Sequence, residues 1–183
     1  MARVPAARRI RLDAMSPARH DARMALEIER KFLVADDGWR RQAGPGQPMR
    51  QGYLAGGKQV SVRVRVAGAQ AWLNVKQAQS LTVRREYEYP IPLADARELL
   101  AHACESGVIE KTRYRVPHAG HVWEVDVFHG DNEGLVVAEV ELASEDQPFE
   151  CPAWLGRDVS AHARYLNHAL ARHPYREWAG TAD

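Results

Sequence analysis

Short segments in which charged and apolar residues alternate constrain the fold of this chain more than any other feature. The first, "EIERKFL", places Glu27, Glu29 and Lys31 on one side of an extended backbone and Ile28 and Phe32 on the other. The same period of two recurs in later segments, at 58–68, 70–77, 83–91, 110–116, 121–128 and 136–143. Turn signals that contain Gly separate these segments, so the pattern predicts a largely antiparallel β protein.

Helical spacing marks fewer segments. Leu93–Cys104 follows Pro92 and carries an apolar stripe, which predicts a helix. Ser160–Arg172 has similar spacing and precedes Pro174, which predicts a second helix. A short helix at 36–42 is a weaker expectation.

The ends of the chain lie outside the regular pattern. Residues 1–23 are rich in Arg and Ala and have no clear period. We expect them to form a disordered basic arm, or to precede a native start at Met24. A chain of 183 residues is long enough for one domain with a sizeable core, which we place at 24–178, followed by a tail at 179–183.

Net charge and cysteine content argue against several classes of protein. The formal net charge of +1 provides no global basic field for nucleic acid. The two cysteines, Cys104 and Cys151, fit neither a disulfide framework nor a zinc site, so we expect a reducing compartment, the cytoplasm. The chain has no apolar run long enough to cross a membrane and no signal-peptide core, so we expect no membrane partner.

The charges of the predicted strands are segregated by sign. Arg63 and Arg65 share one strand face, whereas Glu139 and Glu141 share another. An open sheet would show these faces to water. A closed barrel would instead turn them into a polar lumen and turn the apolar faces outward beneath covering helices. Because like charges two positions apart repel unless something between them is bound, the segregation favours the barrel.

Segregated charges also predict a ligand of high charge density. A polyanion would relieve the basic faces, and the planar guanidinium of Arg suits phosphate oxygens. A divalent cation would relieve the acidic faces, and carboxylates without a Cys or His cluster suit Mg²⁺ or Mn²⁺ rather than Zn²⁺. The sequence lacks a P-loop, a nucleophile elbow and a metal-binding HExxH helix. We therefore expect a small phosphorylated substrate.

The ordered motifs of the chain resemble those of the CYTH superfamily, the triphosphate tunnel metalloenzymes. "EIERKFL" resembles the E-x-E-x-K signature of that family. After it, in the order expected of the small bacterial inorganic triphosphatases, come "MRQGYL", "VRVR", "LNVK", "RREYEY", "EKTRYRV", "WEVDVF", "VAEVEL" and "ARYLNHAL". The resemblance covers Ala25 to about Leu170. It implies a mainly β (α+β) fold, an eight-stranded antiparallel closed β-barrel tunnel with a charged lumen and outer helices covering it.

The resemblance also implies roles for individual residues. Those implied to bind phosphate are Lys31, Arg50, Arg63, Arg65, Lys76, Lys111 and Arg113. Those implied to bind Mg²⁺ or Mn²⁺ are Glu27, Glu29, Glu139 and Glu141, with Glu124 and Asp126 close by. Glu86 and Glu88 are expected to orient basic residues or to hold a second metal. Leu166 and His168 stand where relatives tend to carry Lys or Ser, which weakens the expectation of a phosphate contact from the C-terminal helix.

Lys31, together with Tyr53, is the candidate for activating the attacking water, because a lysine crowded by cations can have a lowered pKa. The expected reaction is metal-dependent hydrolysis of inorganic triphosphate to pyrophosphate and phosphate. Three alternatives stay open: a class IV adenylate cyclase, a thiamine or nucleoside triphosphatase, and a non-catalytic polyphosphate-binding module. A homodimer is also left open.

Overall fold

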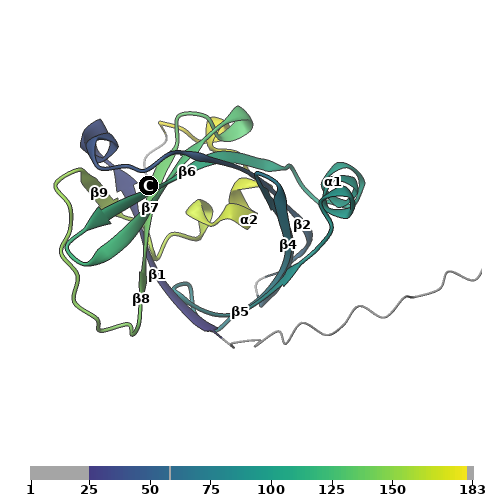
Figure 1. Cartoon of the computed structure of the whole chain (residues 1–183), viewed down its shortest axis with the longest axis horizontal. Helices are drawn as coiled ribbons and strands as arrows, with labels where there is room; N and C mark the ends of the chain where they lie inside the picture. The colour runs from purple at the N-terminus through teal and green to yellow at the C-terminus, as the bar shows by residue number, and fades with distance from the viewer. Residues whose placement is uncertain (1–24, 58, 181–183) are drawn as a thin grey trace, which may run out of the picture.

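The computed structural model describes residues 25–57 and 59–180, so the expectation for residues 1–23 lies outside the described residues. Eight strands form an antiparallel ring in the order β5-β4-β3-β2-β6-β7-β8-β1, and β1 also pairs with β5, which closes the ring (Figure 1). The closed barrel expected from the charge pattern is confirmed. Its strands are β1 (Ala25–Val34), β2 (Gln47–Gly56), β3 (Val60–Ala67), β4 (Gln70–Ala78), β5 (Val83–Pro90), β6 (Ile109–His118), β7 (His121–Phe128) and β8 (Val136–Leu142).

Closure depends on β1, which pairs with different strands along its length. Its first residues, Ala25–Ile28, pair with β5, and Ile28–Leu33 pair with β8. A short ninth strand, β9 (Leu155–Asp158), pairs with β1 at Phe32 and Val34. The sequence did not predict β9, which is too short to establish a period of two.

The outer face of the barrel is apolar, as expected, but a helix covers only part of it. Helix α1 (Leu93–His102) packs its buried Ala96 and Leu100 against Val64 of β3. The other large outer core contains Ile28, Phe32 and three tryptophans, Trp39, Trp123 and Trp154. Trp39 lies in the 3-10 helix η1 (Asp37–Arg41), and Trp154 precedes β9. Irregular segments and β9 therefore replace the covering helices expected on this side.

The helix predicted at 160–172 is wrong. The segment forms a 3-10 turn η3 (Ala163–Tyr165), a single helical turn α2 (Asn167–Leu170) and, farther on, η4 (Tyr175–Glu177). Leu166 between the first two is extended, with φ −72° and ψ 138°.

Packing explains why this segment leaves the regular helix. Tyr165 and Leu170 are buried in a second core with Tyr53, Phe128 and Val137, whose inward-facing strand positions place this core inside the ring. Figure 1 accordingly shows α2 within the ring rather than on its outer surface. None of the helices in the described part of the chain is long and apolar enough to span a membrane.

Candidate active site

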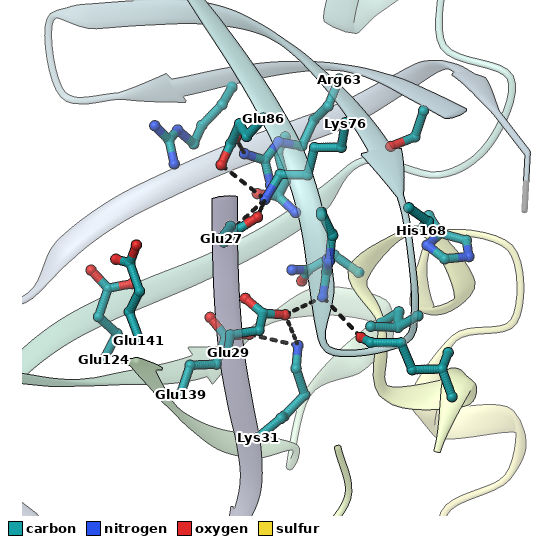
Figure 2. Close-up of a pocket in the computed structure, with 18 of the residues that line it drawn as sticks. Glu27, Glu29, Lys31, Arg63, Lys76, Glu86, Glu124, Glu139, Glu141 and His168 are labelled. Carbon is teal, nitrogen blue, oxygen red and sulfur yellow. Dashed lines mark hydrogen bonds and ion pairs between the residues drawn. The ribbon is translucent and has the colours of Figure 1, made fainter. Parts of the chain in front are cut away.

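The inward faces of the strands enclose a cavity of about 1060 Å³. Because side chains alternate along a strand, one face of each strand lines this cavity, and these are the charged faces predicted from the sequence. The predicted site residues that line it are Glu27, Glu29, Lys31, Tyr53, Arg63, Arg65, Lys76, Lys111, Arg113, Glu124, Glu139 and Glu141. Figure 2 labels several of them, and shows Glu27, Lys31 and Glu139 converging from strands that are far apart in the sequence.

Two predicted site residues lie elsewhere. Arg50 is exposed, and its Nε donates to Glu110 Oε1 at 3.0 Å outside the cavity. This position contradicts the phosphate-binding role predicted for Arg50. Side chains alternate along the strand, and Gln51 and Tyr53 are the residues that face inward. Asp126 is 1% exposed and lies beneath the lining, where it is paired with Lys111 and Arg113.

Strands of opposite sign pair with each other across the lumen wall. Arg113 of β6 pairs in register with Asp126 of β7, and Arg113 Nη2 lies 2.6 Å from Asp126 Oδ2. The same guanidinium contacts Glu139 Oε2 at 2.9 Å and also pairs with Glu124. Glu139 Oε1 in turn accepts from Lys31 Nζ at 2.6 Å. From the sequence alone, we expected a bound ligand to relieve the repulsion between like charges on one strand face. In the structure, opposite charges on neighbouring strands relieve much of this repulsion.

A second network lines the wall formed by β3, β4 and β5. Lys76 Nζ lies 2.7 Å from Glu27 and 3.2 Å from Glu86. Arg63 is 3.5 Å from Glu86, and a separate pair joins Arg65 to Glu88 at 2.6 Å. Glu86 and Glu88 therefore hold basic side chains, which fits the first of the two roles expected for them.

The expected lowering of the Lys31 pKa is wrong. Burial favours the neutral amine, but the carboxylates of Glu139 and Glu29 outweigh it and raise the pKa of Lys31. Burial also raises the pKa of Tyr53, against the opposing effects of Arg63 and Lys31. Both groups are therefore protonated at neutral pH and suit phosphate contacts as donors. Lys111 behaves differently, because burial and the neighbouring Arg113 lower its pKa to about 8.

Glu141 is the carboxylate best placed to receive a metal ion. Within the described part of the chain it has no hydrogen bond or ion pair, and it is exposed to the cavity. Burial, together with the charges of Glu27 and Glu124, raises its pKa. Figure 2 shows Glu141 beside Glu124. These oxygen donors fit a hard divalent cation, although no three such side chains converge to coordinate one among residues 25–57 and 59–180.

Sequence reasoning missed several residues of the lumen. Arg84 lines the cavity and pairs with Glu29. Arg84 is two positions before Glu86 on β5, so the period of two places both side chains on the same face, and this pattern could have identified Arg84. Gln51 lines the cavity, and its side-chain nitrogen has no hydrogen-bond partner within the described part of the chain. His168 of α2 also lines the cavity, with its ring 6.2 Å from that of Tyr53. No strand period predicts His168, because it reaches the lumen through the irregular C-terminal segment.

Known proteins are similar in sequence to this domain over nearly their whole length. A family model described as CYTH domain matches residues 25–173. An inorganic triphosphatase of Acetivibrio thermocellus is 46% identical over 155 residues, which cover 85% of this chain and 99% of that protein. An inorganic triphosphatase of Nitrosomonas europaea is 41% identical over 152 residues, covering 79% of this chain and 96% of that protein.

Solved structures agree with the sequence relatives. A crystal structure of an inorganic triphosphatase has a TM-score of 0.59 at 39% identity and covers 81% of this chain and 95% of its own. A Pyrococcus horikoshii protein, with a TM-score of 0.52 at 16% identity over 66% of this chain and 80% of its own, shares the fold alone. The family match spans the whole barrel, and the chain therefore belongs to the CYTH family.

Proposed function

We propose that this protein hydrolyses inorganic triphosphate to pyrophosphate and phosphate. The observation that carries the proposal is one cavity into which cationic side chains project from five strands, Lys31, Arg63, Arg65, Lys76, Arg84, Lys111 and Arg113. A linear triphosphate has a matching density of negative charge, and guanidinium groups bind its oxygens well. The names of the two relatives above, at 46% and 41% identity, support the same reaction.

The lumen supplies positioning and charge stabilisation rather than a covalent intermediate. Lys31 and Tyr53 keep their protons, so they would donate to phosphate oxygens. Arg113 would spread the charge that develops on the transferred phosphoryl group. The oxygen of water bonds to a terminal phosphorus, the bond from that phosphorus to the bridging oxygen breaks, and pyrophosphate leaves. One proton of the water stays on the new phosphate and the other is released.

Glu141 would hold Mg²⁺ or Mn²⁺ with help from Glu27, Glu29 and Glu124, which are among the carboxylates that raise its pKa. The bound cation supplies Lewis-acid polarisation of a phosphoryl oxygen. Mg²⁺ usually takes one or two carboxylates together with substrate phosphates, which matches a lumen where most carboxylates are already paired. Glu139 and Asp126 have cations on both oxygens, so we assign them to orienting Lys31, Lys111 and Arg113.

A second candidate is hydrolysis of a triphosphate that carries an organic group, such as a nucleoside or thiamine triphosphate. One observation favours it: Val60, Leu81 and Val122 line the same cavity although they are 46%, 41% and 42% exposed. Exposed apolar side chains beside a phosphate-binding lumen suit a planar organic group.

The thiols of Cys104 and Cys151 are free, and we place the protein in the reducing cytoplasm on that ground.

A substrate panel separates these candidates. Purified protein is incubated with tripolyphosphate, ATP or thiamine triphosphate in the presence of Mg²⁺ or Mn²⁺, and released phosphate, pyrophosphate and cyclic AMP are measured. We expect tripolyphosphate to be cleaved fastest. Faster release from ATP or thiamine triphosphate would replace the first candidate by the second, and cyclic AMP would refute both.

The metal assignment is tested separately by two matched variants. Glu141→Gln should abolish metal-dependent turnover, whereas Glu110→Gln, on the outer face, should not change it. Full activity of Glu141→Gln would contradict the assignment.

A further inference from the structure

One neutral residue lies at the centre of the charged wall formed by β3, β4 and β5. Asn74 is fully buried, and its Nδ2 donates to Glu86 Oε1 at 2.8 Å and to Glu88 Oε2 at 2.6 Å. The register explains these contacts, because Asn74 is opposite Arg63 on β3 and opposite Glu88 on β5. A single amide nitrogen therefore bridges two carboxylates of one strand.

Each bridged carboxylate in turn contacts cations that line the cavity. Glu86 lies 3.2 Å from Lys76 and 3.5 Å from Arg63, and Glu88 lies 2.6 Å from Arg65. Asn74 is not among the side chains that line the cavity. It thus lies beneath the lining, and its hydrogen bonds connect it to the cations through the two carboxylates.

The chemistry of an amide suits this place. Glu86 and Glu88 are two positions apart on one strand face, where like charges repel. The amide offers a hydrogen to each carboxylate without adding a charge, and it shares Glu86 Oε1 with Arg63 and Glu88 Oε2 with Arg65. The amide oxygen of Asn74 has no partner among the described residues.

We infer that Asn74 is a positioning residue, which fixes Glu86 and Glu88 so that Arg63, Arg65 and Lys76 keep the arrangement that binds a triphosphate chain. The inference rests on the proposed function. Loss of the bridge should loosen substrate binding more than it slows the chemical step, because the affected cations neutralise the substrate in its ground state as well as in its transition state.

The test compares Asn74→Leu with a matched variant, Asn132→Leu. Asn132 is 3% exposed and its Oδ1 accepts the backbone N–H of Tyr175 at 2.8 Å, outside the cavity lining. Both variants should lose thermal stability. For Asn74→Leu we expect the tripolyphosphate KM to rise about tenfold, with kcat changed by less than about twofold. Asn132→Leu should keep the wild-type KM.

A second variant guards against misfolding. Asn74→Ser keeps one donor and should give a smaller rise in KM than Asn74→Leu. A wild-type KM in both Asn74 variants, or an equal rise in Asn132→Leu, would overturn the inference. Titration calorimetry with tripolyphosphate in the absence of metal measures the same difference as binding. If the wild-type protein binds tripolyphosphate but releases no phosphate from it, the proposed function fails, and the calorimetric comparison still decides the role of Asn74.

Discussion

Replacing Glu139 by Gln tests how much the stability of the fold depends on the carboxylate that joins Lys31 of β1 to Arg113 of β6. Its side chain is only 11% exposed, and it lies between Lys31 Nζ at 2.6 Å and Arg113 Nη2 at 2.9 Å. In Glu139→Gln, the one carboxylate left in an ion pair with Lys31 among the described residues is that of Glu29, at 3.9 Å. Removing one partner of a buried ion pair costs about 3–5 kcal/mol. Because Arg113 retains Asp126 and Glu124, we expect the lower end, about 3 kcal/mol.

The stability that Glu139→Gln loses relative to wild type should become smaller as the pH falls. Lys31 and Arg113 hold the pKa of Glu139 well below its usual value, although burial alone would raise it. A carboxylate whose folded pKa is lowered contributes stability above its unfolded pKa, and that contribution disappears as the pH falls through the folded pKa. Below an unfolded pKa of about 4.3, wild type should lose about 1.4 kcal/mol per pH unit relative to the variant. The difference in unfolding free energy between wild type and Glu139→Gln, here called the gap, should therefore narrow from about 3 kcal/mol at neutral pH to about 2 kcal/mol at about pH 3.5.

Urea unfolding without metal or phosphate, at neutral pH and in acid, measures both quantities. The matched control is Glu110→Gln, whose carboxylate is 49% exposed and pairs with Arg50 at 3.0 Å. An exposed pair of this kind contributes less than about 1 kcal/mol. The reasoning is refuted if Glu139→Gln is as stable as Glu110→Gln at neutral pH, or if the gap fails to narrow in acid.

Further predictions concern binding and the interior core. Lys111 has a pKa of about 8, so the KM for tripolyphosphate should rise as the pH increases through that value, and Lys111→Arg should flatten this alkaline rise in a KM-against-pH series. Arg84 lines the cavity and Arg85 does not, so Arg84→Gln should raise KM about tenfold while Arg85→Gln leaves it unchanged; equal effects would show that strand parity does not assign the site. Leu170→Ala should cost about 2–5 kcal/mol in urea unfolding, because Leu170 is fully buried in the core inside the ring, and a loss below about 1 kcal/mol would contradict that packing.

The sequence was sufficient to predict which side chains of a strand face inward. The period of two is a local property, so it placed Glu27, Glu29 and Lys31 on one face without knowledge of the neighbouring strands. Applied to every position, it would also have placed Arg84 inside, which motif matching omitted, and Arg50 outside, which motif matching had assigned to phosphate binding.

Pairing between strands was not predictable in the same way. The ion pairs of Arg113 with Asp126 and Glu139 depend on the register of three strands, which no single segment specifies. Tyr165, Leu166, Ala169 and Leu170 have helical spacing, yet Leu166 is extended, because Tyr165 and Leu170 pack into a core inside the barrel. The raised pKa of Lys31 likewise depends on Glu139, which is 108 positions away in the chain.

The pairing of cations with carboxylates makes the two ligands of the lumen interdependent. Lys76 and Arg113 pair with Glu27 and Glu124, two of the carboxylates proposed to help hold the metal ion, so contacts from these cations to phosphate oxygens would weaken the pairs and leave the carboxylates more available to a metal ion. Conversely, carboxylates that turn toward a metal ion release ammonium and guanidinium groups for phosphate. Each ligand should therefore raise the affinity for the other by the same factor, as thermodynamic linkage requires. In the protein without ligands, the cations that would bind phosphate and the carboxylates that would bind metal are paired with each other, so each ligand alone should bind more weakly than it does in the presence of the other.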